Sequence, residues 1–312
     1  MADAIVCECF ARDGLQHETD FVPTATKLSV IEAVRQAGFT RIEASSYSNP
    51  ARVPAFADVE AVMVGLVRSP QVAYKNTCAN LRAVERAVAD LDAGHGADEL
   101  SLLISASESH SRRNLASSRG EQWDRITEMT RLADGRFTLV GVVSVAFGCP
   151  FEGHVDPGVV SDDVARFAEL GVDLVTIGDT TGVATPKTVR SLFQRLMREH
   201  SDLPLVAHFH NTRGTGLVNS VAAYETGVRY FDSALGGVGG HPAEIAYGQG
   251  LTGNVCTEDL VSLFEQMGID TGIDIDGLMR ASQAAESALG RPLYSMVARA
   301  GRIDITRGAL HA

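Results

Sequence analysis

The 312-residue sequence contains no run of about 18 apolar residues, so we expect no membrane-spanning helix. Its first ten residues, MADAIVCECF, hold two acidic residues and no Lys or Arg, which argues against a signal peptide or a transit peptide. Basic residues are also few, since 27 Lys and Arg stand against 39 Asp and Glu, for a net charge of -12. Such a chain has no positive field to attract nucleic acid or an anionic membrane, so neither is an expected partner.

The cysteines and glycines exclude two further kinds of site. The five cysteines are scattered and odd in number, which predicts a reducing, cytoplasmic location and no disulfide framework. Cys7 and Cys9 form a C-x-C pair that no second pair follows, so buried strand thiols are favoured over a zinc site. No G-x-G-x-x-G motif opens the first strand–helix unit, so a dinucleotide site has no support.

Strand-like and helix-like segments alternate along the chain. We expect the first strand at AIVCECFA, from residue 4, and further strands at 41–46, 72–78, 99–104, 137–145, 173–177, 203–209 and 230–234. Helical segments are expected around 28–37, 53–67, 120–133, 159–170, 189–199, 218–226 and 257–267, the last with Thr257 as its N-cap.

Eight such units in this length favour one architecture. They predict an α/β protein with a closed (β/α)8 TIM barrel and additional C-terminal helices, in preference to an open doubly wound sheet. The expected division is a barrel domain over 1–270 and a helical extension over 271–312 that packs on the barrel. Catalytic groups of such a barrel lie at the C-terminal ends of its strands.

The sharpest candidate at these ends is the pair His208 and His210. Residues i and i+2 of a strand face the same side, so both imidazoles can point into the barrel mouth. Together with Asp13, which follows the first strand, they would form a mixed nitrogen and oxygen site. Without a thiolate, such a site suits Mg²⁺ or Mn²⁺ better than a structural zinc ion, and the sequence does not choose between the two.

Other polar residues at strand ends have two interpretations each. Glu43 lies in an otherwise apolar strand and needs a partner; Arg12 is the natural one, either for catalysis or as a purely structural ion pair. Asp179 and Thr180 could line a pocket or cap the following helix. The run 236–240 holds four glycines in five residues, which indicates a lid or a backbone that closely approaches a ligand.

These motifs, taken in order, resemble the HMG-CoA lyase family of metal-dependent TIM-barrel lyases. The matching stretches run across nearly the whole chain: RDGLQ (12–16), IEASSY (42–47), VSVAFGCPFEG (143–153), IGDTTGVATP (177–186), HFHNTRG (208–214), the glycine run and TGNVCTEDL (252–260).

The resemblance implies a role for each matching residue. It implies Asp13, His208, His210 and Asn254 as ligands of a divalent metal ion. Arg12 would polarise the thioester carbonyl and stabilise the enolate, with Glu43 as its partner, and Asp13 or a histidine would remove the hydroxyl proton. The substrate-binding positions that it implies are Gln16, Asp179, Thr180, Gly237 and Gly239. A homodimer or higher homo-oligomer is the family expectation.

The chain also departs from this family. His241 stands where the family has a loop cysteine that takes part in proton transfer, so either His241 replaces the cysteine or the substrate has changed. The stretch between His241 and Asn254 is longer than usual, which would reshape the lid. Asn211 stands after the histidine pair in place of the usual Asp, which would alter how the ligands are held.

The resemblance implies a carbon–carbon lyase that performs metal-dependent retro-Claisen cleavage. The expected substrate is a 3-hydroxy-3-substituted-glutaryl-CoA-like thioester, either HMG-CoA or a larger analogue, and the products are acetyl-CoA and a 3-oxo acid. Two alternatives remain open: a Claisen-type synthase or aldolase of the same superfamily, and a non-catalytic relative that only binds acyl-CoA. Thioester release measured against 2-oxo acid formation distinguishes the synthase from the lyase.

Overall fold

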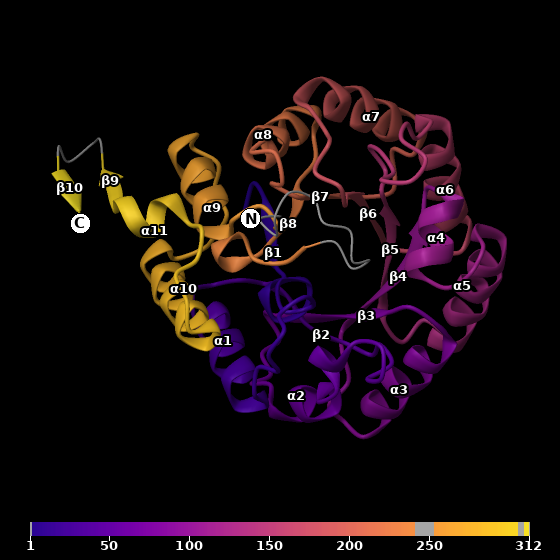
Figure 1. The fold of residues 1–312 in the computed structure, drawn as a ribbon, viewed down its shortest axis with the longest axis horizontal. Helices are drawn as coiled ribbons and strands as arrows, with labels where there is room; N and C mark the ends of the chain where they lie inside the picture. Colours follow the sequence, from indigo (N-terminus) through magenta and orange to yellow (C-terminus); the bar gives the residue numbers. More distant parts are fainter. Residues whose placement is uncertain (1, 241–252, 305–308, 312) are drawn as a thin grey trace.

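The computed structural model describes residues 2–240, 253–304 and 309–311 of the chain. Eight parallel strands pair in chain order and close on one another, which confirms the predicted (β/α)8 barrel (Figure 1). They are β1 (Ile5–Glu8), β2 (Arg41–Ser46), β3 (Ala73–Cys78), β4 (Glu99–Ser105), β5 (Thr138–Ser144), β6 (Leu174–Asp179), β7 (Leu205–Phe209) and β8 (Tyr230–Ser233). The pairing of β1 with β8 closes the barrel.

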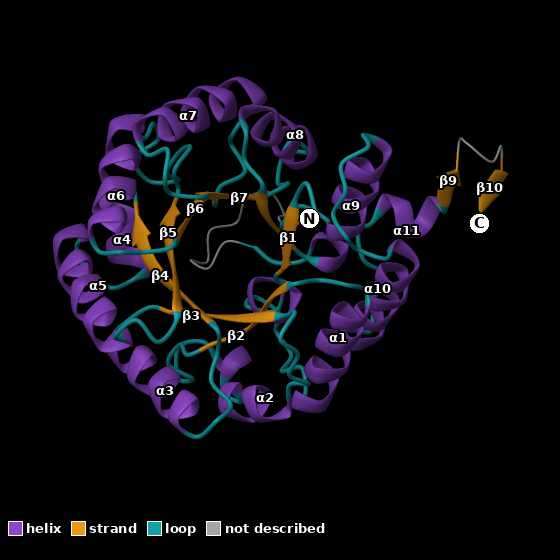
Figure 2. Ribbon diagram, turned by 180° about the vertical axis from the view of Figure 1, so that it is seen from behind, coloured by secondary structure: helices purple, strands orange, loops and turns teal. Residues whose placement is uncertain are grey.

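Helices surround this barrel on all sides, as the view from behind shows (Figure 2). The α-helices of the ring are α1 (Thr24–Gln36), α2 (Val59–Gly65), α3 (Leu81–Asp92), α4 (Glu108–Asn114), α5 (Arg119–Ala133), α6 (Pro157–Glu169), α7 (Pro186–Glu199), α8 (Gly216–Thr226) and α9 (Thr257–Gln266). Their apolar faces and the outward-facing strand residues form the main hydrophobic core. None of the described helices is both long and apolar enough to cross a membrane.

The C-terminal part adds more than the expected helices. Helices α10 (Ile275–Leu289) and α11 (Met296–Ala300) follow α9, and α10 lies beside α1 (Figure 1). The backbone amide of Asp274 donates to the carbonyl of Ala37, at the end of α1, over 2.8 Å. The strands β9 (Arg302–Asp304) and β10 (Ala309–His311), which the sequence did not predict, then form an antiparallel pair.

Several predicted boundaries are wrong for identifiable reasons. The first strand does not continue to Ala11 but ends at Glu8, and the chain then coils into the short π-helix η1 (Phe10–Gly14). The expected helix over 53–67 is divided into a 3₁₀ turn, η2 (Pro54–Phe56), and α2, and α2 ends at Gly65 because the chain becomes extended at Leu66.

The N-cap of α9 is also misassigned. Cys256 occupies that position, and Thr257 is the first helical residue, whose hydroxyl bonds to that of Ser233 over 2.8 Å. Helices α3 and α4 were not predicted at all.

Candidate active site

A cavity of about 490 Å³ opens at the C-terminal ends of the barrel strands. Seven of the predicted site residues line it: Arg12, Asp13, Gln16, Glu43, Thr180, His208 and His210. Asn254, Asp179, Gly237 and Gly239 are not among its lining residues, and His241 lies outside the described part of the chain. The cavity therefore joins residues from η1, β2, β7 and the loop after β6.

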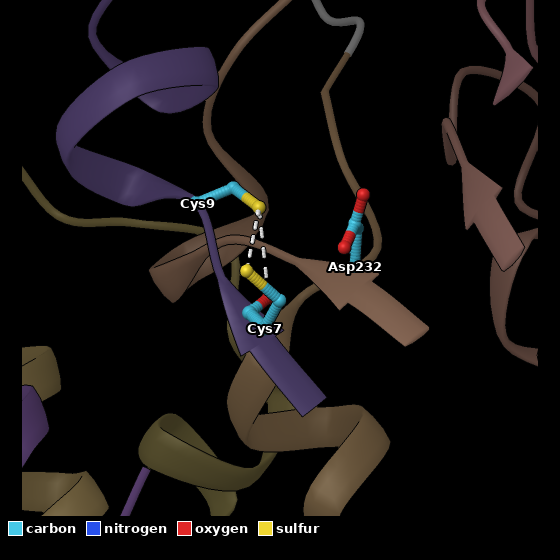
Figure 3. A group of neighbouring side chains, drawn as sticks. All are labelled: Cys7, Cys9 and Asp232. Atoms are coloured by element: carbon cyan, nitrogen blue, oxygen red, sulfur yellow. Dashed lines mark hydrogen bonds between the residues drawn. The ribbon is translucent and has the colours of Figure 1, made fainter. Parts of the chain in front are cut away.

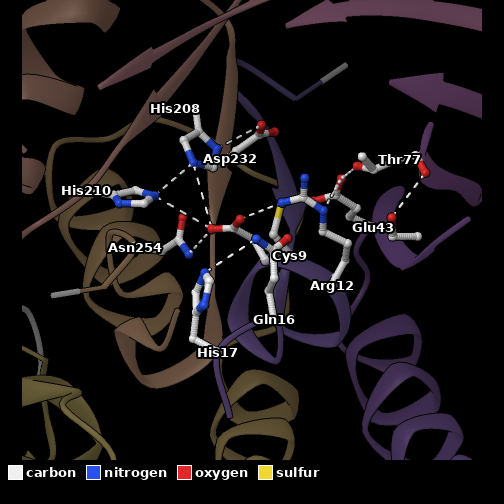
Figure 4. A network of polar contacts seen from close by, with 12 residues as sticks. Cys9, Arg12, Gln16, His17, Glu43, Thr77, His208, His210, Asp232 and Asn254 are labelled. Atoms are coloured by element: carbon white, nitrogen blue, oxygen red, sulfur yellow. Dashed lines mark hydrogen bonds and ion pairs between the residues drawn. The ribbon is translucent and has the colours of Figure 1, made fainter. Parts of the chain in front are cut away.

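Asp13, His208 and His210 converge on one point at the mouth of this cavity (Figure 4). One ligand atom from each lies within 4.8 Å of the others. The two Nε2 atoms of the histidines are 3.3 Å apart, and Asp13 Oδ2 is 3.6 Å from His210 Nε2 and 4.0 Å from His208 Nε2. Two imidazole nitrogens and a carboxylate oxygen at such distances form a suitable donor set for a divalent cation.

Asn254 joins this cluster from the chain segment before α9. Its Nδ2 donates to Asp13 Oδ2 over 2.6 Å and to the carbonyl of Val238 over 3.0 Å. Its Oδ1 is buried and has no hydrogen-bond partner among the described residues, and the same holds for Nδ1 of His210. Because buried polar atoms are normally paired, the free amide oxygen beside two imidazoles and a carboxylate supports the fit to a metal ion.

Electrostatics keep the carboxylate of this cluster ionised. Burial alone raises the pKa of Asp13, but the hydrogen bond with His210 and the charges of Arg12 and His208 lower it well below its usual value. Burial lowers the pKa of His208, but its hydrogen bond to Asp232 and the charge of Asp13 outweigh burial and raise the pKa above its usual value. The carboxylate is thus available as an anionic ligand at neutral pH.

Arg12 is placed by the π-helix η1, whose wide turn brings it and Asp13 to the same mouth. Its Nη1 donates to Asp13 Oδ1 over 2.5 Å, and its Nε lies 3.5 Å from Glu43 Oε1. Thr77, on β3, donates its hydroxyl to the same Glu43 oxygen over 2.8 Å. Burial lowers the pKa of Arg12, but Glu43 and Asp13 raise it above its usual value, so the guanidinium remains a fixed positive charge facing the cavity.

Asp179, the last residue of β6, and Thr180, which follows it, make different contacts. The carboxylate of Asp179 is fully buried and accepts the amides of Val183 and Ala184, each over 3.0 Å, so it holds the turn that precedes α7. Thr180 lines the cavity, and its hydroxyl accepts the amide of Val145 over 2.9 Å. Asp179 therefore acts through the shape of the loop in this structure, and its contact with substrate stays a prediction.

The glycine run holds its backbone against the ligand residues. Gly239 has φ +108°, and a Cβ there would lie 2.6 Å from Asn254 Nδ2 and 2.9 Å from the carbonyl oxygen of Asp13. Gly237 has φ +63°, a conformation that side chains rarely adopt. The glycine run therefore lets the backbone approach the site closely, which supports this interpretation of the run over a lid.

Sequence reasoning missed Asp232 and Lys75, two charged residues that lie in strands of the barrel. Asp232, on β8, accepts the Nδ1–H of His208 over 3.2 Å and leaves Nε2 of that ring facing the cluster. Lys75, on β3, has its Nζ 3.6 Å from Asp232 Oδ2 and 3.9 Å from Glu43 Oε1. The signal that identified Glu43, a charged residue inside a strand, would have found both.

Cys7, Cys9 and Asp232 form a second group of metal-ligand types, deep in the barrel (Figure 3). The Cys9 thiol points to the carbonyl of Cys7 at 3.6 Å and to its sulfur at 4.0 Å. Burial raises the pKa of Cys9 well above its usual value, and Asp232 already bonds His208. Both cysteines are therefore buried thiols, as expected, but only Cys7 lies in a strand, because β1 ends at Glu8.

Asn211, which departs from the family pattern, does not contact the histidine rings through any hydrogen bond of the described residues. Its side-chain Oδ1 accepts the backbone amide of Gly216 over 2.9 Å, and its backbone amide donates to the carbonyl of Gly253 over 2.7 Å. It joins the loop after β7 to the start of α8 and to the residue before Asn254.

Comparison with known proteins agrees with this geometry. The HMGL-like family model matches residues 4–284. The chain is 36% identical to hydroxymethylglutaryl-CoA lyase, mitochondrial, of Macaca fascicularis, over 95% of this chain and 88% of that protein. It is 35% identical to the (R)-citramalyl-CoA lyase of Chloroflexus aurantiacus, over 97% of this chain and 96% of that protein.

Solved structures of HMG-CoA lyases are also similar to this chain. An HMG-CoA lyase from Acinetobacter baumannii in complex with coenzyme A and 3-methylmalate superposes with a TM-score of 0.89 at 39% identity, over 96% of this chain and 95% of that one. The hydroxymethylglutaryl-CoA lyase from Pseudomonas aeruginosa gives a TM-score of 0.89 at 32% identity, over 96% and 97% of the two chains.

Proposed function

The chain belongs to the HMGL-like family and is a carbon–carbon lyase, and from this premise we propose that it cleaves a 3-hydroxy acyl-CoA with the help of Mg²⁺ or Mn²⁺. Substrates such as HMG-CoA or a larger analogue would give acetyl-CoA and a 3-oxo acid. A citramalyl-CoA-like substrate, in which the carboxylate is attached directly to the carbinol carbon, would give a 2-oxo acid instead. The observation that carries the proposal is the convergence of Asp13, His208 and His210 beside Arg12.

Asp13, His208, His210 and Asn254 would hold the metal ion. Once bound there, the ion would act as a Lewis acid that lowers the pKa of the substrate hydroxyl. Asp232 keeps the His208 ring in the tautomer that presents Nε2, because a carboxylate can only accept from Nδ1–H. Asp13 or one of the histidines would receive the hydroxyl proton.

Arg12 would stabilise the negative charge that develops on the thioester oxygen. The bond between C2 and C3 breaks, C3 becomes the carbon of a ketone, and the electron pair passes into the thioester enolate. Protonation of the enolate carbon then completes acetyl-CoA. A fixed guanidinium aimed at the enolate oxygen is worth most in the transition state, and Glu43 and Asp13 hold that guanidinium in place. The proton donor stays a prediction, with His241 as the candidate.

Gln16, Thr180, Asp179, Gly237 and Gly239 are proposed to shape the substrate site. Gln16 and Thr180 line the cavity directly. Asp179 and the two glycines would act by holding the loops that surround it. A homodimer or higher homo-oligomer and a cytoplasmic location also remain part of the proposal.

The test is a mass-spectrometric screen of acyl-CoA thioesters with the purified chain and added Mg²⁺ or Mn²⁺. We expect acetyl-CoA to appear together with an oxo acid, to stop when a chelator is added, and to be lost in His208→Ala. The exposed His154, replaced by Ala, is the matched control and should keep full activity. Binding of acyl-CoA without turnover across the panel would support the non-catalytic alternative, and net bond formation from acetyl-CoA and an oxo acid would support the synthase.

A further inference from the structure

Lys75 is an unusual feature of the barrel interior. The chain contains three lysines, Lys27, Lys75 and Lys187, and all the rest of its Lys and Arg residues are arginines. Lys75 is the third residue of β3, so it lies below the strand ends that form the mouth. It is 2% exposed, yet it lines the same cavity as Arg12 and Glu43. A buried ammonium is costly unless something pairs with it.

The protein compensates the charge of Lys75 without satisfying its donors. Asp232 Oδ2 and Glu43 Oε1 lie 3.6 Å and 3.9 Å from Nζ, which is close enough for attraction and too far for hydrogen bonds. Burial lowers the pKa of Lys75, but Asp232, Cys7 and Glu43 raise it well above the usual value, so the group stays protonated. Its three N–H donors therefore have no acceptor at bonding distance among the described residues, although the side chain lines the cavity.

Two hydroxyls that line the same cavity as Lys75 also lack partners among the described residues. Ser101 Oγ, on β4, and Thr176 Oγ1, on β6, are buried and have no hydrogen-bond partner in the described part of the chain. Both line the cavity, and Ser101 pairs in register with Thr77, whose side chain faces the barrel interior. Buried polar groups are normally hydrogen-bonded, so these donors indicate an acceptor that enters the cavity.

We propose that Lys75, Ser101 and Thr176 form an anion-binding floor of the acyl cavity that binds the carboxylate of the substrate's acyl chain. The proposal rests on the proposed function, because both kinds of acyl-CoA considered there carry such a carboxylate. The acyl end of the substrate then points into the barrel, and the thioester end lies nearer the mouth. Lys75 would thereby select acyl chains that end in a carboxylate over neutral chains of the same shape.

The experiment compares HMG-CoA with the analogue in which its free carboxylate is a carboxamide. The dissociation constants of both are measured by calorimetry on chelator-treated protein, and kcat/KM is measured on the metal-loaded enzyme. A charge-assisted hydrogen bond predicts that the wild type prefers the carboxylate about 10- to 100-fold. Lys75→Met should reduce this preference to within a few fold, and Lys75→Arg should keep part of it.

Lys27 supplies the matched control. It is equally buried, but its Nζ bonds directly to Asp58 Oδ1 and to the carbonyl of Ala55, each over 2.6 Å, and it does not line the cavity. Lys27→Met should therefore lower stability and leave the carboxylate preference unchanged. Ser101→Ala should give a smaller loss of preference than Lys75→Met.

The outcomes separate the inference from the proposed function. A Lys75→Met protein that keeps the wild-type preference overturns the inference, as does one that loses affinity for both ligands equally, which would reveal a structural role alone. A wild type that binds the carboxylate selectively but cleaves neither thioester with Mg²⁺ or Mn²⁺ contradicts the proposed function and leaves the anion-binding floor intact.

Discussion

At the scale of single residues, carboxylates alternate with cationic or imidazole side chains around the inside of the barrel. Each neighbour in this ring lies within 4.0 Å of the next in the described structure: Asp13, Arg12, Glu43, Lys75, Asp232, His208 and again Asp13. Isolated buried charges would each cost several kcal/mol. Because the two kinds of side chain alternate, each one compensates the charge of two neighbours. The same contacts fix the orientation of the cationic and metal-binding groups together.

Asp232 is the member of this ring that orients a metal ligand without binding the metal. We predict that Asp232→Asn weakens Mn²⁺ binding about 10- to 100-fold, because losing the carboxylate frees the His208 ring to rotate or change tautomer. The measurement is a calorimetric titration of the metal-free protein with Mn²⁺.

Asp163→Asn is the control for this experiment. Asp163 is also buried, but it pairs with Arg119, Trp123 donates to it, and it does not line the cavity. Its replacement should lower stability and leave the Mn²⁺ affinity unchanged. An Mn²⁺ affinity of Asp232→Asn equal to that of the wild type would show that packing alone holds the His208 ring.

At the scale of elements, two short helical turns carry the site, and Glu8 joins them. One of its carboxylate oxygens accepts the amide of Phe10, at the start of η1, over 3.0 Å. The other accepts the amide of Leu235, at the start of the 3₁₀ turn η3 (Leu235–Gly237), over 2.7 Å. Glu258 accepts the next amide, that of Gly236, over 2.8 Å. The loops that hold Asp13 and the glycine run are thus anchored to one buried carboxylate pair.

This anchor predicts a dependence of stability on pH. Burial raises the pKa of Glu8 to about 8, against the opposing effect of its two backbone hydrogen bonds. Between about pH 4.5 and pH 8 the unfolded chain loses this proton and the folded chain keeps it, so folding becomes less favourable as pH rises. Glu8 should therefore lower the free energy of unfolding by about 1 kcal/mol per pH unit across this range.

Glu8→Gln provides the measurement, since it keeps the shape of the side chain and removes the titration. Urea unfolding of both proteins at pH 5.5, 7 and 8.5 should show that the stability of the wild type, relative to the variant, decreases as the pH rises. Parallel curves for the two proteins would mean that Glu8 titrates in the folded state as it does in the unfolded chain.

The elements also show what sequence could and could not predict. The clearest strand, β5, was found because its sequence is almost continuously apolar and β-branched, which is typical of a strand covered on both faces. Helix α3 was missed although Asn80 caps it and Val84 and Ala87 bury its inner face, so the signal was present. Helix α4 has seven mostly polar residues, and no apolar period could have revealed it. The π-helix η1 depends on contacts with the carbonyl of Cys9, which no local pattern specifies.

In the site as well, some residues were predicted from the sequence and others were not. Arg12, Asp13, Glu43, His208, His210 and Asn254 were predicted, and the barrel brings them together because each lies in or just beyond a strand or in the segment before α9. Lys75 and Asp232 were missed although each, like Glu43, is a charged residue inside a strand. Their pairing could not be predicted, because it appears only when β3 and β8, which are not neighbours in the barrel, face each other across its interior.

At the scale of the whole molecule, we propose that the helical extension expected over 271–312 packs on the barrel and unfolds together with it. The family model runs to residue 284, well into α10. The apolar side of α10, with Leu278, Ala281 and Ala285, is buried, and α10 packs against α1. Beyond it, the amide of Tyr294 donates to the carbonyl of Gly236 over 3.0 Å, so the extension also supports the glycine run.

We therefore predict that a chain ending at residue 270 does not fold as a stable barrel. Leu278→Ala tests the same packing without removing the segment, and it should cost about 2–5 kcal/mol because its fully buried side chain leaves a cavity between α10 and the barrel. Urea unfolding followed by circular dichroism and by Trp123 fluorescence should give one coincident transition for wild type and variant, since α10 and the barrel unfold together. A Leu278→Ala protein in which the barrel signal keeps its midpoint while part of the helical signal is lost earlier would show that residues 271–312 form a separate unit.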